Sequence, residues 1–478
     1  MNKTNLTMMC DFYELTMANG YLEAGMEDKI CYFDVFFRNI PDKAGFAIFA
    51  GLEQIVDYIK NLHFTDEDIE YLKKQKLFSN AFLNYLKDFK FNGDIYSVKE
   101  GTPIFPNEPV MTVRAKAIEA QFIETFILSN VNHQSLIATK TNRIVRTAGS
   151  KGISEFGARR AHGPEAATLG ARAAYIAGVV GTSNTLTGRL FGVPVSGTMG
   201  HSWVQMFDSE YEAFKKYCEI YPDASVILVD TYNVLQSGVP NAIKVFNEVL
   251  KPLGKRPLGI RIDSGDIAYL SKSARKMLDA AGYSDCKIVA SNSLDEYIIR
   301  DLEFQNAKID SFGVGERLIT SKSDPVFGGV YKLSAVENDK GEVIPKIKIS
   351  ENIDKITTPH YKKVYRLFDN ENNKAIADLI TVYDEVIDVT QPLEIFDPVS
   401  TWKRKTITNF KAVPILQAIF KDGKQVYDLP TLPEIREYCA NQIDLLWDEV
   451  KRFESPHRFY VDLSQKLWDI KDSMLPRK

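Results

Sequence analysis

The feature that most constrains the fold is an alternation of short apolar segments with helical patterns, which begins at Gly152. The apolar segments are brief, end in polar residues or glycine, and read as strands at 153–156, 178–181, 193–197, 226–230, 259–262, 287–290 and 311–314. Helical patterns, for example at 165–176 and 268–281, separate most of them. This alternation predicts parallel strands joined by crossover helices. Seven such units favour an α/β fold built on an irregular (β/α) barrel.

The segments on either side of the alternation have different patterns. The N-terminal segment combines short helices, a strand at 32–38 and a small β unit between 91 and 113. Beyond the alternation strands and turns return, with a hairpin around 338–341, and 430–470 has a helical pattern. A chain of 478 residues is too long for one compact core. We therefore predict an N-terminal α+β domain over 1–145, a barrel domain with the active site over 146–345, and C-terminal strands and helices over 346–478 that pack on the other two.

Three helices can be predicted in more detail near the N-terminus. Thr65 is the expected N-cap of one helix, with Asp68 placed three residues later as in a capping box. A shorter helix near the N-terminus is predicted to have one apolar face, formed by Phe12, Leu15 and Met17. The long helical pattern over 118–145 contains polar residues that predict a break into two helices, namely Asn130, Asn132 and His133.

Charge and cysteine content exclude several classes of protein. The formal net charge of −4 gives no general attraction to nucleic acid or to an anionic membrane, so a phosphorylated substrate has to be held by local positive groups. No apolar run reaches the roughly 18 residues of a membrane span, and the N-terminus lacks the pattern of a secretory leader. The five cysteines are scattered with no CxxC pair, which predicts reduced thiols, no structural zinc site and a cytoplasmic location.

In a (β/α) barrel the functional groups lie at the C-terminal ends of the strands. Here those ends carry glycines, hydroxyls, arginines, acids and one histidine. The most informative is PVSGTMGHSWVQ over 194–205, in which small residues after a strand present bare backbone N–H groups that can hold an anion. His201 follows directly, at a predicted junction between strand and helix, where it suits phosphate chemistry. A structural histidine that caps this helix is the alternative.

The arginines and acids at other strand ends also allow two interpretations. Arg159 and Arg160 can hold phosphates, or can form an ordinary ion-pair network. Asp263 and Asp266 can bind magnesium or sugar hydroxyls, or can cap the helix that follows. A type I phosphoribosyltransferase is rejected, because its motif needs two successive acids and Thr231 stands in the second position. An aldolase or isomerase that forms a Schiff base is disfavoured, because no lysine lies at these strand ends.

Eight segments together resemble the nicotinate phosphoribosyltransferases, a type II phosphoribosyltransferase family. They occur in family order and read DFYELTMANGY, EFGARRAHG, GTSNT, GTMGHSWVQ, VDTYN, RIDSGD, VASN and FGVGERL. The resemblance implies an N-terminal α/β domain, an irregular α/β barrel, a C-terminal part, and a homodimer whose active site lies between subunits. It also implies an ATP-coupled reaction of nicotinate with phosphoribosyl pyrophosphate, with Mg²⁺ as cofactor. The products would be nicotinate mononucleotide and pyrophosphate, in the first step of NAD synthesis from nicotinate.

The resemblance implies a role for each matching residue. His201 matches the family's phosphorylated histidine, and a neutral imidazole nitrogen can attack the γ-phosphate of ATP. Tyr13, reaching across the dimer, and Phe156 would stack on the two faces of the pyridine ring. The remaining implied contacts are Arg261 and Thr198 with the nicotinate carboxylate or the ribose phosphate end, Arg159 with the product phosphate or the base, Asp263 with ribose hydroxyls or Mg²⁺, and Ser291, Asn292, Gly313 and Gly315 with the 5′-phosphate.

Ser183 bears on which base is used. The related nicotinamide enzymes carry an aspartate at this position, which suits an amide, whereas a serine hydroxyl can donate to the nicotinate carboxylate. Nicotinate is therefore the expected base. Nicotinamide phosphoribosyl transfer is the alternative reaction, and a non-catalytic relative that binds nucleotide is the alternative class. The sequence departs from the pattern of some relatives at Asn233 and at Glu316-Arg317, which leaves the phosphate contacts near residue 315 open.

Overall fold

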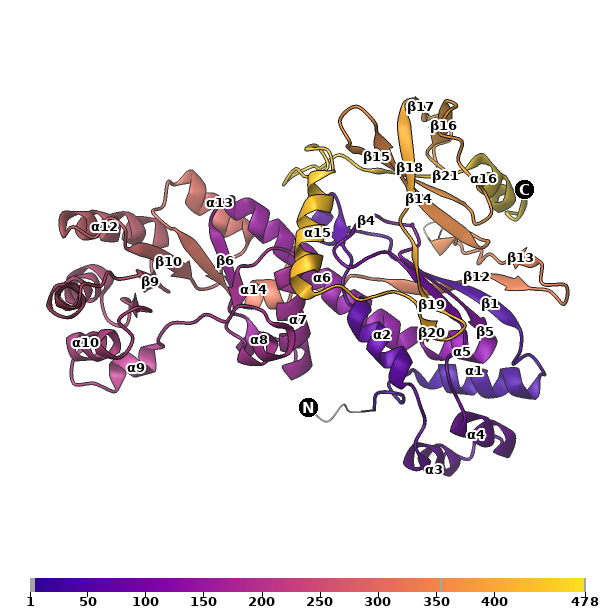
Figure 1. Ribbon diagram of the computed structural model, residues 1–478, viewed down its shortest axis with the longest axis horizontal. Helices are drawn as coiled ribbons and strands as arrows, with labels where there is room; N and C mark the ends of the chain where they lie inside the picture. Colours follow the sequence, from indigo (N-terminus) through magenta and orange to yellow (C-terminus); the bar gives the residue numbers. More distant parts are fainter. Residues whose placement is uncertain (1–4, 353–354, 477–478) are drawn as a thin grey trace. The chain divides into compact units, whose positions relative to one another are not determined.

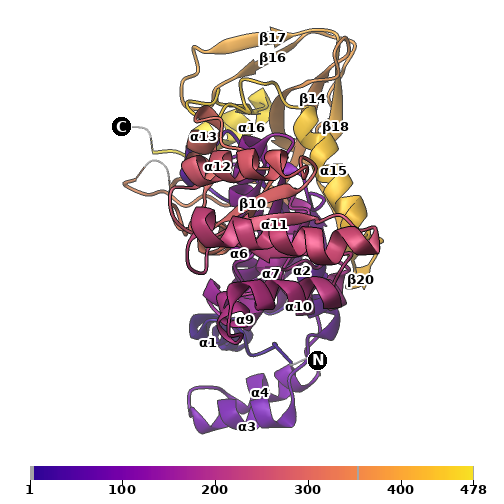
Figure 2. The ribbon, with the colours of Figure 1, turned by 90° about the vertical axis from the view of Figure 1, so that its left-hand side faces the viewer.

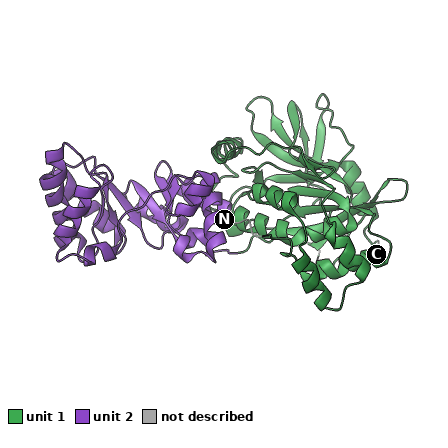
Figure 3. Cartoon of the chain, turned by 60° about the horizontal axis from the view of Figure 1, so that its bottom comes forward, with its two compact units in different colours: residues 1–136, 326–478 green, residues 137–325 purple. Residues whose placement is uncertain are grey.

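The computed structural model of the chain describes residues 5–352 and 355–476. It divides into two compact units (Figure 3). Unit 1 combines Met1–Leu136 with Val326–Lys478, and unit 2 is Ile137–Pro325. Unit 1 is thus built from both ends of the chain, with unit 2 inserted between them. The division into three domains at residues 145 and 345 stays a prediction.

Unit 2 contains a parallel sheet that carries the strand ends singled out above (Figure 1). Within the described residues the sheet has six strands in the order β7-β6-β11-β10-β9-β8, and all neighbouring strands are parallel. A parallel bridge between Thr182 and Val195 continues the order beyond β7. The strands are β6 (Gly152–Glu155), β7 (Gly181–Thr182), β8 (Val226–Leu228), β9 (Gly259–Ile262), β10 (Lys287–Ser291) and β11 (Ser311–Val314).

Helices connect these strands, as parallel pairing requires. The three helices α10, α11 and α12 lie side by side (Figure 2). Their apolar residues form one core with the sheet, in which Phe214, Phe246 and Ile260 are fully buried. The α-helices of the unit are α7 (Pro164–Ile176), α8 (Thr185–Phe191), α9 (His201–Gln205), α10 (Glu210–Ile220), α11 (Val239–Val245), α12 (Ile267–Ala280), α13 (Glu296–Phe304) and α14 (Glu316–Ile319).

The predicted strands agree closely with this sheet, apart from the two next to α8. Strands β9 and β11 have the predicted bounds, and β6, β8 and β10 differ by one or two residues at their ends. The strand predicted at 178–181 is wrong in its first residues, because Gly178 has φ of 121° and its N–H donates to Tyr175 O to close α7. The strand predicted at 193–197 contributes only the single bridge at Val195.

Unit 1 contains two larger sheets. Of the described strands, seven form the sheet β13-β12-β1-β5-β3-β19-β20 and four form the sheet β18-β14-β15-β21. The first sheet mixes both ends of the chain, because β12 pairs with β1 and β19 pairs with β3. The strands are β1 (Ile30–Phe36), β2 (Ala47–Ile48), β3 (Asp94–Ser97), β4 (Pro103–Ile104), β5 (Met111–Lys116), β12 (Val330–Glu337), β13 (Val343–Pro345), β14 (Lys362–Asp369), β15 (Ala375–Val382), β16 (Leu393–Phe396), β17 (Arg404–Ile407), β18 (Phe410–Pro414), β19 (Gln417–Lys421), β20 (Lys424–Gln425) and β21 (Tyr460–Leu463).

The helices of the N-terminal segment of unit 1 pack on the first sheet, α16 packs on the second sheet, and the long α6 continues from unit 1 into unit 2. One core includes residues of α1, α2 and α6 with β1, β5 and β19, for example Leu15, Ile55 and Ile127. The α-helices are α1 (Phe12–Glu23), α2 (Leu52–Asn61), α3 (Asp66–Lys74), α4 (Asn80–Lys87), α5 (Ala117–Phe122), α6 (Glu124–Ala148), α15 (Leu432–Asp444) and α16 (Gln465–Ser473). No helix of the described segments is both long and apolar enough to cross a membrane.

Several local predictions in unit 1 are confirmed. Thr65 caps α3, and its hydroxyl accepts from the Asp68 N–H at 3.2 Å while Asp68 accepts from the Thr65 N–H at 2.8 Å. The hairpin expected around 338–341 joins β12 to β13. The helical pattern predicted over 430–470 is correct for α15 and for the start of α16, but β21 lies between them as a strand parallel to β15.

Two helix predictions are wrong. The break in the long helical stretch lies at Ile123, between α5 and α6, and not at the polar residues further on. Those residues are accommodated: Asn130 donates to Phe126 O one turn earlier, and Asn132 accepts from the Gly329 N–H. The predicted apolar face of α1 is also different. Leu15 is buried, whereas Phe12 is 48% and Met17 is 37% exposed.

Candidate active site

Arg261 ties three strand ends of unit 2 together. It is the third residue of β9, and its guanidinium donates to Ser291 Oγ at 2.8 Å, to Thr198 Oγ1 at 3.0 Å and to Asp263 Oδ1 at 2.8 Å. Ser291, the last residue of β10, also donates to Asp263 Oδ1. Four of the residues predicted for the site therefore form one hydrogen-bonded cluster.

His201 lies beside this cluster. It is the first residue of α9, as predicted for the helix, while the strand predicted before it is reduced to the bridge at Val195. Its Nδ1 is 3.2 Å from Thr231 Oγ1, and its Nε2 is 3.9 Å from Asp263 Oδ2 and 4.0 Å from Asp230 Oδ1. The side chain is 42% exposed, so the ring is fixed on one side and remains accessible to a ligand.

Asp230 is the site residue that the sequence prediction missed. Its side chain is only 1% exposed. Oδ2 accepts from the Asp263 N–H at 3.2 Å and from the Ser264 hydroxyl at 2.6 Å. Oδ1 is buried, and no residue of the described chain hydrogen-bonds to it. The available signal is the acid that directly follows an apolar strand in VDTYN.

These carboxylates fit the Mg²⁺ ion that the family resemblance implies. Mg²⁺ prefers oxygen ligands, and it is usually held by one or two carboxylates together with substrate phosphates. Asp230 Oδ1 is a buried acceptor without a partner among the described residues, and Asp263 Oδ2 lies within 4 Å of the same imidazole nitrogen. Two convergent carboxylate oxygens are the donor set expected of such a site.

Phe156 presents its ring at the end of β6. A Cβ on Gly313 would lie 2.5 Å from this ring, so only glycine at that position allows the ring to approach the β11 backbone. The Arg261 guanidinium carbon is 5.6 Å from the ring centroid. The aromatic side chain is thus wedged between β11 and the arginine of the cluster.

The residues predicted for the 5′-phosphate meet at two neighbouring strand ends. Ser291 and Gly313 are register partners in the β10–β11 pair. After β10 the backbone is left-handed at Asn292, with φ of 87°, and at Ser293, with φ of 49°. Gly315 precedes α14, whose Arg317 forms an ion pair with Asp295. The chain therefore turns directly after β10 and after β11. Successive backbone N–H groups in such turns can form a nest that binds an anion.

Three further predicted residues are exposed and take no part in the hydrogen-bonded cluster that is described above. Arg159 is exposed in a short 3-10 helix (Ala158–Arg160) after β6, and Ser183 is exposed directly after β7. Tyr13 belongs to unit 1, where it is 43% exposed on α1. Burial of part of its ring and a hydrogen bond to Glu124 raise the pKa of the Tyr13 hydroxyl, so the side chain is a neutral phenol at physiological pH.

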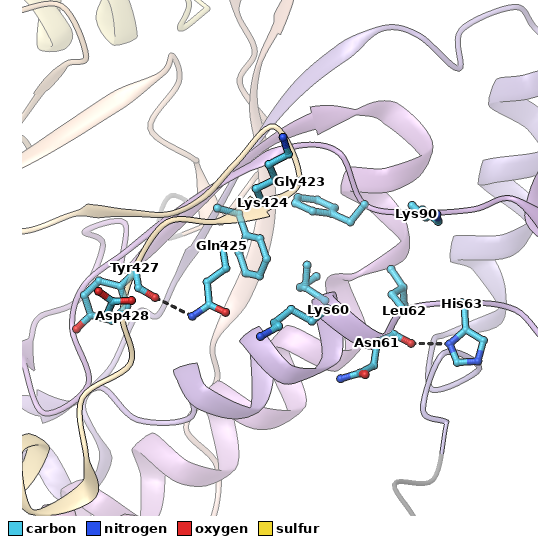
Figure 4. Close-up of a pocket in the computed structure, with 13 residues that line it drawn as sticks. Lys60, Asn61, Leu62, His63, Lys90, Gly423, Lys424, Gln425, Tyr427 and Asp428 are labelled. Atoms are coloured by element: carbon cyan, nitrogen blue, oxygen red, sulfur yellow. Dashed lines mark hydrogen bonds between the residues drawn. The ribbon is translucent and has the colours of Figure 1, made fainter.

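Unit 1 also has a groove of about 850 Å³ between the end of α2 and the β19–β20 hairpin (Figure 4). Its polar groups are partly paired with each other. Gln425 donates to Tyr427 O at 2.7 Å, and His63 Nδ1 lies 2.7 Å from Asn61 O. None of the residues that line the groove in the described chain was predicted for the site.

A parallel sheet with polar groups gathered at its strand ends is typical of α/β enzymes. Comparison with known proteins specifies the family. Family models match over most of the chain: the nicotinate phosphoribosyltransferase N-terminal domain at residues 8–132, the nicotinate phosphoribosyltransferase family at 152–384, and the nicotinate phosphoribosyltransferase C-terminal domain at 361–471. The chain belongs to the nicotinate phosphoribosyltransferase family, and it is an enzyme of that activity.

Individual relatives agree with this assignment. The nicotinate phosphoribosyltransferase of Bacillus subtilis is 46% identical over 98% of this chain and 94% of its own length. The crystal structure of human nicotinic acid phosphoribosyltransferase superposes with a TM-score of 0.87, at 27% identity, over 97% of this chain and 99% of that one. A nicotinate-nucleotide pyrophosphorylase from Pyrococcus furiosus, with a TM-score of 0.70 and 24% identity over 93% of this chain and 97% of that one, shares the fold.

Proposed function

We propose that the chain joins nicotinate to phosphoribosyl pyrophosphate, releases pyrophosphate and nicotinate mononucleotide, and couples this transfer to ATP hydrolysis through a phosphorylated His201. The reaction is the first step of NAD synthesis from nicotinate. The observation that carries the proposal is the cluster at the strand ends, in which one accessible imidazole lies beside an arginine, two carboxylates and two hydroxyls.

The phosphoryl step uses the environment of His201. A neutral ring nitrogen forms a bond to the γ-phosphorus of ATP while the bond from that phosphorus to the bridging oxygen breaks, so ADP leaves. Hydrolysis of the P–N bond later returns the imidazole and releases phosphate. Thr231 fixes the ring through its contact with Nδ1. Asp230 and Asp263 would hold Mg²⁺, which supplies charge neutralisation for the phosphate groups that react and leave.

The transfer step uses the rest of the cluster. The pyridine nitrogen attacks the anomeric carbon, the bond to pyrophosphate breaks, and positive charge develops on the sugar. Asp263 would stabilise that charge and would hold ribose hydroxyls or Mg²⁺. Arg261 and Thr198 would meet the nicotinate carboxylate or the ribose phosphate end, and Arg159 the product phosphate or the base. Ser291, Asn292, Gly313 and Gly315 would bind the 5′-phosphate.

The base would lie between two aromatic rings. One is Phe156, which Gly313 and Arg261 hold in place. The other would be Tyr13 of the partner subunit of a homodimer, and the exposed, uncharged phenol ring on α1 suits such stacking. Ser183 would donate to the carboxylate and favour nicotinate over nicotinamide.

Two wider features belong to the same proposal. The strand order, read from β6 through β7, Val195, β8, β9 and β10 to β11 and back to β6, follows chain order around a ring, which supports an irregular barrel that closes between 195 and β8. The cytoplasm is the compartment in which we propose the enzyme acts. Its buried, unpaired cysteines, such as Cys218 and Cys286, suit a reducing environment.

Turnover with each base tests the proposal. The purified enzyme is incubated with phosphoribosyl pyrophosphate and Mg²⁺, with nicotinate or nicotinamide, and with or without ATP. We expect nicotinate mononucleotide, faster with ATP, and loss of the ATP effect in His201→Ala. His457→Ala, which changes an exposed histidine of unit 1, serves as the control and should keep it. Preference for nicotinamide would refute the role of Ser183, and no product with either base would indicate a non-catalytic relative.

A further inference from the structure

Glu155 is a fully buried carboxylate at the end of β6 that has no part in the proposed chemistry. Its side chain has 0% exposure. Oε2 accepts from the Thr182 hydroxyl at 2.6 Å, and Oε1 accepts from the Gly157 N–H. Burial raises the pKa of Glu155, and these two donors oppose that shift. A buried acid lowers the stability of the fold unless it is fully hydrogen-bonded. The presence of Glu155 at this strand end therefore needs an explanation.

The bond to Thr182 orders the loop that carries Ser183. Glu155 and Thr182 are register partners across β6 and β7, and the Ser183 N–H donates to Glu155 O at 2.9 Å. Thr182 Oγ1 in turn accepts from the Asn184 N–H at 3.0 Å. Asn184 caps α8 by accepting from the N–H groups of Leu186 and Thr187. A continuous chain of hydrogen bonds therefore runs from Glu155 through Ser183's two neighbours to the start of α8.

The bond to Gly157 orders the other side of the same carboxylate. Phe156 lies between Glu155 and Gly157, so its backbone is held at both ends, and its N–H donates to Val314 O at 2.7 Å. Gly157 has no room for a side chain, because a Cβ would lie 2.6 Å from Ile319 and 2.8 Å from Glu155 Oε1. The turn after β6 is therefore specified by the carboxylate on one side and by α14 on the other.

We propose that Glu155 is a positioning residue for the nicotinate site, which sets the Phe156 ring and the Ser183 hydroxyl relative to each other by bridging the ends of β6 and β7. The inference rests on the proposed function, in which these two residues contact the base. His201 lies outside this bridge and makes its contacts with Thr231, Asp230 and Asp263. Glu155 therefore acts on the binding of the base and not on the phosphoryl step.

Glu155→Gln tests this directly. The amide keeps the shape of the side chain, but with its oxygen toward the Gly157 N–H it reverses the second bond, because the Thr182 hydroxyl must then accept from the amide NH₂ and no longer donates. Displacement of a binding group by about 1 Å can cost up to roughly a hundredfold. We expect a smaller displacement here, and therefore a rise of about tenfold in the KM for nicotinate. We expect kcat and the nicotinate-independent hydrolysis of ATP to stay within about twofold.

Thr182 supplies the second arm of the experiment. Thr182→Val removes the hydroxyl and should raise the KM for nicotinate, whereas Thr182→Ser retains the hydroxyl and should restore it. The double variant of Glu155→Gln and Thr182→Val should cost less than the sum of the single changes, because both break one bridge. Glu119→Gln is the matched control. Glu119 is a buried glutamate of unit 1 that accepts from the Asn92 N–H and side chain, and its change should leave the KM alone.

The outcomes separate the two levels of the proposal. If the parent enzyme makes no nicotinate mononucleotide, the proposed function fails and the inference fails with it. If the parent is active but the KM for nicotinate does not move in Glu155→Gln and Thr182→Val, the inference alone fails. The same holds if the two changes are additive, or if ATP hydrolysis falls as much as nicotinate binding. Should Glu155→Gln not fold, the pair Thr182→Val and Thr182→Ser decides.

Discussion

Arg261 is the residue on which the geometry of the strand-end cluster depends. Its planar guanidinium donates to Thr198, Asp263 and Ser291 in three directions at once, which an ammonium group cannot reproduce. We predict that Arg261→Lys lowers kcat/KM by about a hundredfold, because misplacement of the cluster by about 1 Å has an effect of that order. Steady-state kinetics with nicotinate measure this directly.

Arg275→Lys provides the comparison. Arg275 lies in the same unit and donates to Asp279 and to the backbone oxygens of Tyr283 and Cys286. Its change should lower the melting temperature but leave kcat/KM within about threefold. Arg261→Lys would contradict the prediction if it kept more than a tenth of the parent activity, or if its kinetic loss only followed a loss of folded protein.

Much of the site is predictable at this scale, and one part is not. Arg261 lies in β9 and Asp263 directly after it, His201 follows the bridge at Val195, and parallel pairing brings such strand ends together. Asp230 also follows a strand, but its importance comes from a buried Oδ1 that lies near His201 and has no hydrogen-bond partner among the described residues. Burial and hydrogen-bond satisfaction depend on tertiary contacts, and no local pattern encodes them.

At the scale of single elements, the capping box of α3 is a local feature with a measurable effect. The Thr65 hydroxyl and the Asp68 carboxylate satisfy each other's backbone N–H groups. We predict that Thr65→Ala lowers the free energy of unfolding by about 1 kcal/mol, the usual cost of losing such a cap. Urea denaturation measures it. Thr65→Ser should cost clearly less, and equal losses in both variants would contradict a capping role.

Helix α1 carries a titratable group with an effect on stability. Burial raises the pKa of Glu14 from an ordinary value of 4.5 to about 8, although Thr125 donates to it. The folded protein therefore binds the proton more tightly than the unfolded chain, and this group's contribution to stability falls as pH rises from about 5 to about 8.

Glu14→Gln removes that titration. We predict that the stability of the parent, measured by urea unfolding relative to Glu14→Gln, declines steadily between pH 5 and pH 8. Glu23→Gln, which changes an exposed acid at the end of the same helix, should show no such trend. A constant difference between parent and Glu14→Gln across this range would refute the prediction.

Elements are predictable where the local signal is strong, as at Thr65, β9 and β11. The predictions fail where a tertiary contact overrides the local signal. The polar residues expected to break α6 are satisfied by Phe126 O and by the Gly329 N–H, a partner almost two hundred residues away. Likewise α1 buries Glu14 and exposes Phe12, because a contact with Thr125 and not apolar periodicity sets its orientation.

At the scale of the whole molecule, the proposed shared site makes a prediction about mixed dimers. Co-expression of Tyr13→Ala and His201→Ala subunits yields half mixed dimers, and in each of these one site receives both changes while the other receives neither. Each variant alone should have almost no ATP-dependent activity. We predict that the co-expressed pair recovers about a quarter of the ATP-dependent activity of the unmodified enzyme. If Tyr13 serves the site of its own chain, no mixed dimer has an intact site and activity stays at the level of the separate variants.

The discontinuous path of unit 1 has a consequence for the synthesis of the enzyme. Strand β1 ends at Phe36, but β12, which covers one of its edges, begins only at Val330. At a translation rate of about 5 to 20 residues per second, the ribosome needs roughly 15 to 60 seconds to supply that partner. During this interval the nascent chain exposes an unpaired strand edge and an unfinished core, while the whole of unit 2 emerges. The part of the enzyme that is made first is therefore completed last.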